Sequence, residues 1–192
     1  MMKAKAAQFG GAAKEASYAL ARAGSAEKNG ALLNTAECID TGRAHIRKAN
    51  AKDLAEGKKA GLSAALLDRL ELNDTRIDGL CEGLEQIVAL PDPVGATISG
   101  WKRPNGLNIR QVRVPIGVVF MIYESRPNVT IDAGALCLKS GNACILRGGR
   151  EALNSNLCLG TMLKKGLASV GLPGECIQIV DTPDRDLVKE LL

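Results

Sequence analysis

The run PIGVVFMIYESRPNVT (residues 115–130) decides how the rest of the chain is interpreted. Its first half, Pro115 to Ile122, is almost entirely apolar, which is typical of a strand buried on both faces of a parallel sheet. Its second half is polar, and Pro127 fixes the backbone there and holds Arg126 extended. We therefore expect a strand over 116–123, a polar turn at its carboxyl end, and a helix near 129–139.

The sequence beyond this run continues to alternate. We predict a strand over 143–147, a helix near 151–170, a strand over 176–180 and a helix from Pro183. Apolar strands that alternate with amphipathic helices form right-handed βαβ units. The predicted fold class is therefore α/β: N-terminal helices, then a β-arm, then βαβ units of a parallel Rossmann-like sheet. Three parallel strands leave a sheet edge bare, and the pattern stops at Leu192, so we expect the front part of a larger protein.

Residues 1–97 are predicted to form a helical part of the same unit. Ser25 is a candidate helix cap, and Asn73 begins a second helix that ends before Pro91 and carries Cys81 in its apolar stripe. The first of these helices has an apolar face made of Leu32, Leu33, Ala36 and Ile39.

Residues 98–114 differ from both neighbours. A turn signal at Pro104-Asn105-Gly106 separates two short β-like segments in which polar and apolar residues interleave, so we expect a two-stranded arm. An arm with so few core residues is often covered by another subunit, although a plain surface hairpin is an equally simple interpretation. Residues 115–192 then form the predicted βαβ part.

Composition excludes several classes of function. The chain has 192 residues, of which 46% are hydrophobic, and a net charge of +4, which does not indicate a nucleic-acid or membrane-surface partner. The basic stretch Arg43 to Lys59 is interrupted by acidic residues, and we interpret it as a solvated helix face.

The cysteines and the single histidine, His45, form no metal-ligand spacing and leave little for Ser-His-Asp catalysis. Six scattered thiols, no signal peptide and no membrane-spanning run lead us to expect a cytoplasmic protein. The thiols of Cys81, Cys137, Cys144, Cys158 and Cys176 fall on apolar elements and are interpreted as small core residues.

Ligands of open parallel sheets bind at the carboxyl ends of the strands, where this sequence places two unusual loops. The second loop, Arg147-Gly148-Gly149-Arg150, opens a helix whose amino end favours anions, so it suits a phosphate. A tight turn with exposed arginines explains the same residues about as well. In the first loop, Glu124-Ser125-Arg126-Pro127-Asn128, Asn128 is either an ordinary helix cap or a donor to a developing oxyanion, and Arg126 would face an anionic substrate.

At these residues the chain resembles a known family. The segment RVPIGVVFMIYESRPNVTIDAGALCLKSGNACILRGGREALNSN (residues 113–156) is similar to gamma-glutamyl phosphate reductases, within the aldehyde dehydrogenase superfamily. The likeness extends to LNDTRIDGLCEGLEQIVALPDPVG, to the arm, and to GLPGECIQIVDTPDRDLVKELL, and so covers nearly the whole chain.

The resemblance implies NADPH-dependent reduction of L-glutamyl 5-phosphate to L-glutamate 5-semialdehyde, in proline biosynthesis, through a cysteine thioester. It assigns Arg147, Gly148, Gly149 and Arg150 to the 2′-phosphate of NADPH, and Tyr123, Glu124 and Ser125 to the dinucleotide. Asn128 becomes the candidate oxyanion donor and Arg126 a substrate contact, while the nucleophilic cysteine lies in a downstream segment that this chain lacks.

The resemblance also implies a homo-oligomer formed through the 98–114 arm and makes glutamate 5-kinase a candidate partner. The alternative is a non-catalytic binding or assembly module that pairs with a full-length enzyme.

Overall fold

A three-stranded parallel sheet lies at the centre of the protein, in the order β3-β4-β5. In the computed structural model, which describes residues 2–182 and 184–192, β3 (Val118–Ile122) pairs with β4 (Ala143–Arg147), and β4 pairs with β5 (Ile177–Ile179). The strands that the sequence predicted and their parallel order are confirmed. The last helix, α8 (Arg185–Leu191), is also present, while Pro183, where we predicted its start, lies outside the described residues.

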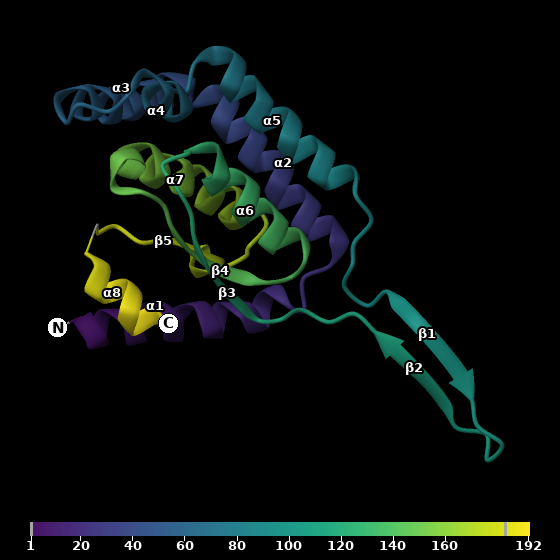
Figure 1. The fold of residues 1–192 in the computed structure, drawn as a ribbon. Helices are drawn as coiled ribbons and strands as arrows, with labels where there is room; N and C mark the ends of the chain where they lie inside the picture. The colour runs from purple at the N-terminus through teal and green to yellow at the C-terminus, as the bar shows by residue number, and fades with distance from the viewer. Residues whose placement is uncertain (1, 183) are drawn as a thin grey trace.

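Helices cover the two faces of this sheet (Figure 1). One face packs against α6 (Asn128–Lys139) and α7 (Leu153–Ser169), and the other face packs against α1 (Met2–Leu20), beside which α8 lies. Short 3-10 turns precede α7 and β5, at Arg150–Ala152 and Gly174–Cys176. The larger core lies on the α6–α7 side, and a smaller one between α1, α8 and the sheet is built from Ala6, Ala13, Ile145, Val180 and Leu187.

A layer of N-terminal helices covers α6 and α7. It consists of α2 (Ser25–Thr41), α3 (Arg43–Lys59), α4 (Ala64–Leu70) and α5 (Asp74–Ala89), and α2 packs against both α7 and α5. Asn73 caps α5 as predicted, because its side chain accepts a hydrogen bond from the Arg76 N–H at 2.9 Å. Of the helices that the structure describes, none combines the length and the apolar character needed to cross a membrane.

Two details of the predicted helix from Ser25 are wrong. The cap position is Gly24, whose N–H donates to the Glu27 carboxylate at 2.7 Å, while the Ser25 hydroxyl bonds to Asp92 instead. Leu33 was predicted to face the core but is 47% exposed, whereas Leu32, Ala36 and Ile39 are buried. The apolar stripe is therefore narrower than the sequence pattern indicates.

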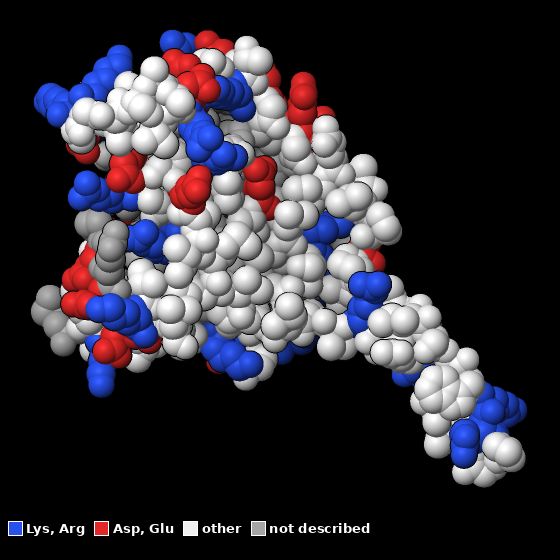
Figure 2. Space-filling view, viewed as in Figure 1, with Lys and Arg blue, Asp and Glu red and all other residues white. Residues whose placement is uncertain are grey.

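The predicted arm is an antiparallel hairpin that extends away from the helices and the sheet (Figure 1). Strands β1 (Thr97–Lys102) and β2 (Asn108–Val112) are joined by a turn in which Gly106 adopts φ +89°, a conformation that favours glycine. Between 97 and 114 every residue except Ile109 is exposed, including Trp101 and Leu107. The arm carries four basic residues and no acidic one, and its outer part is blue in Figure 2.

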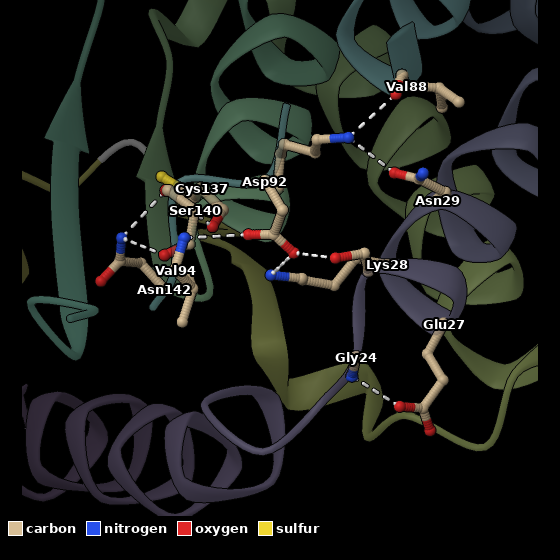
Figure 3. A network of polar contacts seen from close by, with 12 residues as sticks. Gly24, Glu27, Lys28, Asn29, Val88, Asp92, Val94, Cys137, Ser140 and Asn142 are labelled. Carbon is tan, nitrogen blue, oxygen red and sulfur yellow. Dashed lines mark hydrogen bonds and ion pairs between the residues drawn. The ribbon is translucent and has the colours of Figure 1, made fainter. Parts of the chain in front are cut away.

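A buried polar network holds the connector from which the arm emerges (Figure 3). Lys28 of α2 is 1% exposed and pairs with the Asp92 carboxylate at 2.6 Å, and Asp92 also accepts from the Ser25 hydroxyl and the Val94 N–H. Burial opposes the ionisation of Asp92, but these hydrogen bonds outweigh it and lower the pKa of the carboxyl.

Lys139, at the end of α6, donates to the Asn29 side chain at 2.7 Å and to the Val88 carbonyl at 2.9 Å. Because a buried ammonium must be hydrogen-bonded to be tolerated, these contacts hold the end of α6 against α2 and α5, beside the connector.

Candidate functional site

The two loops that the sequence singled out meet at the carboxyl ends of β3 and β4. The Tyr123 N–H donates to the Arg147 carbonyl at 3.0 Å, which extends the pairing of the two strands by one residue. The Ser125 hydroxyl donates to the Glu151 carboxylate at 2.6 Å, so side chains also join the loops. The predicted adjacency of these loops is therefore confirmed.

Tyr123 ties the first loop to the helices below it. Its hydroxyl lies 2.7 Å from the Thr130 hydroxyl, and the latter donates to the Asn156 side chain of α7 at 3.0 Å. Burial raises the pKa of Tyr123 to about 12, so the phenol is neutral at physiological pH. The hydroxyl is used to hold the structure, and the exposed neighbour Glu124 faces outward from the same loop.

Gly148 and Gly149 allow the two loops to approach each other. A Cβ on Gly148 would lie 2.9 Å from the Tyr123 ring and would also clash with Asn156. A Cβ on Gly149 would overlap the Ser125 side chain and lie 2.9 Å from the Glu151 carboxylate. Neither glycine has a positive φ, so the reason for glycine here is space, and side chains of the protein fill that space.

The amino end of α7 is already occupied by a carboxylate of the protein. Asp53, from α3, is 1% exposed and accepts from the N–H groups of Asn154 at 3.1 Å and Ser155 at 2.7 Å, as well as from both side chains. A helix amino end favours an anion, and here Asp53 supplies it. Asp53 therefore takes two of the N–H groups at this helix end, and the phosphate that we expect near the second loop stays a prediction that draws on other donors.

The side chains around that loop provide such donors. Arg147 ends β4 in a half-buried position, and Arg150 lies in the 3-10 turn with a largely exposed side chain that bonds to the Glu151 carboxylate at 3.2 Å. The hydrogen bond from Ser125, supported by Arg150, lowers the pKa of Glu151 and keeps it ionised. Sequence reasoning missed Glu151, although its place at the start of a helix is a known signal for an acidic residue.

Asn128 and Arg126 lie on the other side of the first loop. Asn128 is the first residue of α6, and its amide donates to the Asp132 carboxylate at 3.1 Å, so the interpretation as a helix cap is wrong. Together with Arg126 it lines a cavity of about 560 Å³ between the α4–α5 turn and the start of α6. Arg126, Glu124 and Ser125 also line a neighbouring cavity of about 310 Å³.

All six cysteines lie within the described residues, and all are free thiols. Cys137, Cys144 and Cys176 are buried, as predicted for core residues, and Cys158 and Cys81 are half-buried. Burial raises the pKa of Cys81, Cys158 and Cys176, the last to about 11, and a hydrogen bond with Cys137 raises that of Cys144. The same bond lowers the pKa of Cys137, which lies near the end of α6, away from both loops.

Within the described residues, no group of three or more His, Cys, Asp and Glu side chains is arranged to hold a metal ion. The two loops place arginines, a carboxylate and an amide around two adjoining cavities.

No family model matches the chain. It is 55% identical over 184 residues to a gamma-glutamyl phosphate reductase of Rhodospirillum rubrum, which covers 96% of this chain and 43% of that protein. The crystal structure of gamma-glutamyl phosphate reductase from Thermotoga maritima superposes with a TM-score of 0.95 at 41% identity, over 97% of this chain and 45% of that one. The crystal structure of gamma-glutamyl phosphate reductase from Saccharomyces cerevisiae superposes with a TM-score of 0.88 at 31% identity, over 95% of this chain and 47% of that one.

The chain therefore spans less than half the length of these relatives. A putative aldehyde dehydrogenase from Bacillus subtilis, at 16% identity and a TM-score of 0.70 over 99% of this chain and 38% of that one, shares the fold alone. The aldehyde dehydrogenase-like fold, seen here in part, is thus confirmed.

The Asp53 carboxylate gives the first testable prediction. Asp53→Ala leaves the N–H groups of Asn154 and Ser155 buried without an acceptor, so we expect urea denaturation to show a loss of about 3 kcal/mol in the free energy of unfolding. Glu56→Ala, an exposed change one turn along α3, is the control and should stay within about 0.5 kcal/mol of the parent. Equal losses for the two variants would show that Asp53 does not anchor α7.

Proposed function

We propose that this chain, which corresponds in sequence and fold to the N-terminal part of gamma-glutamyl phosphate reductases, serves the NADPH-dependent reduction of L-glutamyl 5-phosphate to L-glutamate 5-semialdehyde. The proposed setting is proline biosynthesis in the cytoplasm. The observation that carries the proposal is the meeting of two ligand-suited loops at the carboxyl ends of β3 and β4, in a chain 55% identical to a protein of that name.

The cofactor would be held by side chains from both loops. Arg147 and Arg150 would contact the 2′-phosphate. Gly148 and Gly149 leave space for the side chains of Tyr123 and Ser125 to pack against the second loop. Glu124 and Ser125 line the smaller cavity and would contact the dinucleotide. When bound, the nicotinamide supplies a hydride to the acyl carbon.

The substrate would bind on the side of Arg126 and Asn128. One amide N–H of Asn128 bonds to Asp132, and the other remains for an oxyanion that develops at the reacting carbonyl. Arg126 has an exposed guanidinium at the mouth of both cavities and suits an anionic group.

The thioester-forming cysteine would come from outside residues 1–192. Four of the six thiols here have raised pKa values, Cys137 lies on α6 and is 7% exposed, and Cys38 lies near the end of α2. A nucleophile needs both thiolate character and access to the reacting carbon. The proposed activity therefore requires further chain, in keeping with the 43% coverage of the R. rubrum relative.

The exposed arm supports a second candidate function, a non-catalytic module that assembles with a full-length enzyme. Trp101 and four other large apolar residues lie exposed near four basic side chains on the arm, and that combination suits a protein partner. In the enzyme itself the arm would join subunits, and glutamate 5-kinase is a candidate partner because it would supply an acyl phosphate.

The proposed function is tested by turnover. We expect residues 1–192 alone to show no NADP⁺ reduction with L-glutamate 5-semialdehyde and phosphate, and activity to appear when a downstream segment with its cysteine is supplied. The assay follows absorbance of NADPH with purified chain. Turnover that survives repurification and is lost on replacing one of the six cysteines would place the nucleophile in this chain; no activity with any downstream half would favour the assembly module.

Arg147 is expected to set the preference for NADPH. Charge-assisted hydrogen bonds contribute roughly 1.5–3 kcal/mol, so Arg147→Ala should weaken NADPH binding about tenfold or more and leave NADH nearly unchanged. Titration by NADPH fluorescence measures this, with Arg113→Ala on the arm as the control. An equal loss for both cofactors would mean that Arg147 acts only on the structure of the loop.

The arm is expected to mediate self-association. Deleting residues 100–110 removes the exposed hairpin while keeping the Lys28–Asp92 pair at its base, so light scattering should show a shift toward monomer with little change in helix content. A parent chain that is already monomeric, or an oligomer whose mass survives the deletion, would contradict this role.

A further inference from the structure

The cavity of about 560 Å³ has charged walls of both signs, and we name it the α4–α6 cavity. Its walls come from α4, from the start of α5 and from the start of α6. Arg69, Arg76 and Arg126 line it together with Asp68, Glu71 and Asp132. Its volume is within the usual range for a small-molecule site. The charged side chains that are not paired with other residues of the protein determine which kind of ligand the cavity can bind.

Arg76 and Asp68 are used to hold the α4–α5 turn. The Arg76 guanidinium donates to the Asp68 carboxylate at 3.0 Å, to the Glu71 carbonyl at 3.0 Å and to the Asp68 carbonyl. These bonds satisfy carbonyls at the end of α4 and fix its position against α5. The turn is thus a rigid wall of the cavity.

Arg69 and Arg126, unlike Arg76, do not pair with other residues of the protein. Within residues 2–182 and 184–192, neither guanidinium has a hydrogen bond or an ion pair, although Arg43, Arg47 and Arg76 nearby in sequence are all paired with aspartates. Both of them line the α4–α6 cavity and also the neighbouring cavity of about 310 Å³. Two cations from separate elements therefore adjoin the same space.

Asp132 supplies the opposite charge. It is half-buried on α6 and lines the α4–α6 cavity. Its carboxylate accepts a hydrogen bond from the amide of Asn128 at 3.1 Å and has no cationic partner among the described residues. Burial raises the pKa of Asp132, and the bond from Asn128 offsets only part of that rise. A cationic group in the cavity would stabilise the ionised carboxylate.

We propose that the α4–α6 cavity binds the α-amino acid head group of the substrate, with Arg69 and Arg126 on the α-carboxylate and Asp132 on the α-ammonium. This rests on the proposed function, and it deepens it by placing Arg69 and Asp132 at the site. A zwitterion satisfies both signs of charge in the cavity, whereas a phosphate dianion would satisfy the arginines and be repelled by Asp132 and Glu71.

The placement is consistent with the path of the substrate. The smaller cavity shares Arg69 and Arg126 with the α4–α6 cavity and adds Ser125 and Glu151 from the two loops. A head group held in the α4–α6 cavity therefore directs the acyl end past Asn128 toward the cofactor loops. The phosphoryl group lies at that acyl end, away from Asp132.

The test is binding of L-glutamate to the chain 1–192, followed by NMR and by isothermal titration. We expect shifts in the amides of residues 69–76 and 126–132, and weakening of about tenfold or more in Arg69→Gln, Arg126→Gln and Asp132→Asn. Glutarate, which lacks the ammonium, should bind weakly and should not lose affinity in Asp132→Asn. Arg47→Gln and Glu82→Gln, two exposed changes outside both cavities, are matched controls and should bind L-glutamate as the parent does.

Each result decides between alternatives. Inorganic phosphate that competes for the same residues with equal or greater affinity than L-glutamate would assign the cavity to phosphate and overturn the proposal. Unchanged L-glutamate affinity in Asp132→Asn and Arg126→Gln, both with parent-like thermal unfolding, would overturn it as well. NADPH titration separates the two hypotheses, because a parent chain that binds NADPH but not L-glutamate rejects the head-group site and leaves the proposed reductase function standing.

Discussion

The buried carboxylate of Asp53 is the contact on which the arrangement of the site depends. It reaches from α3 to the amino end of α7, and it accepts four hydrogen bonds from Asn154 and Ser155. One turn earlier, Asn50 bonds to the Leu70 carbonyl, the Leu72 N–H and the Ser155 hydroxyl, so the same face of α3 also holds the α4–α5 turn. The same polar face of α3 thus fixes the position of the second loop, which leads into α7, relative to the wall of the α4–α6 cavity.

Sequence reasoning could predict the sheet because its signal is local. β4, the run ending at Arg147, is buried as expected, but β3 is only half-buried and ends at the exposed Ile122, so our prediction that this strand is buried on both faces is wrong. The apolar character of both runs still predicts strands, because hydrophobic burial needs no knowledge of the partner. The meeting of the two loops then follows from parallel pairing, since the carboxyl ends of neighbouring parallel strands lie at one edge. The structure brings together Ser125 and Glu151 in the way that this geometry requires.

The buried polar contacts could not be predicted, because in the sequence a polar residue at a buried position cannot be told apart from one exposed to solvent. The buried residues of α3 are Ile46, Asn50, Asp53 and Gly57, at helical spacing, but only the first is a large apolar residue, so the pattern of a basic, solvated helix conceals the stripe. Lys28 presents the same difficulty, because its 1% exposure depends on Asp92, which is distant in sequence. Ser25 was taken as a cap for the same reason: its bond to Asp92 is tertiary, and no local rule contains it.

Charged side chains that stabilise this protein are paired within it, whereas charged side chains that can bind a ligand are not. Lys28, Asp53 and Lys139 are buried, and each is satisfied by hydrogen bonds, since an unsatisfied charge there would cost several kcal/mol. Arg69 and Arg126 are exposed, so water satisfies their donors at little cost and the guanidinium groups need no protein partner. Such a group gains most when a ligand displaces that water inside a cavity, where the effective dielectric constant is lower. Asp132, half-buried and without a cation, is the group whose ionised form stands to gain most from a bound ammonium, and that difference in burial is why the cavity favours a zwitterion over a simple anion.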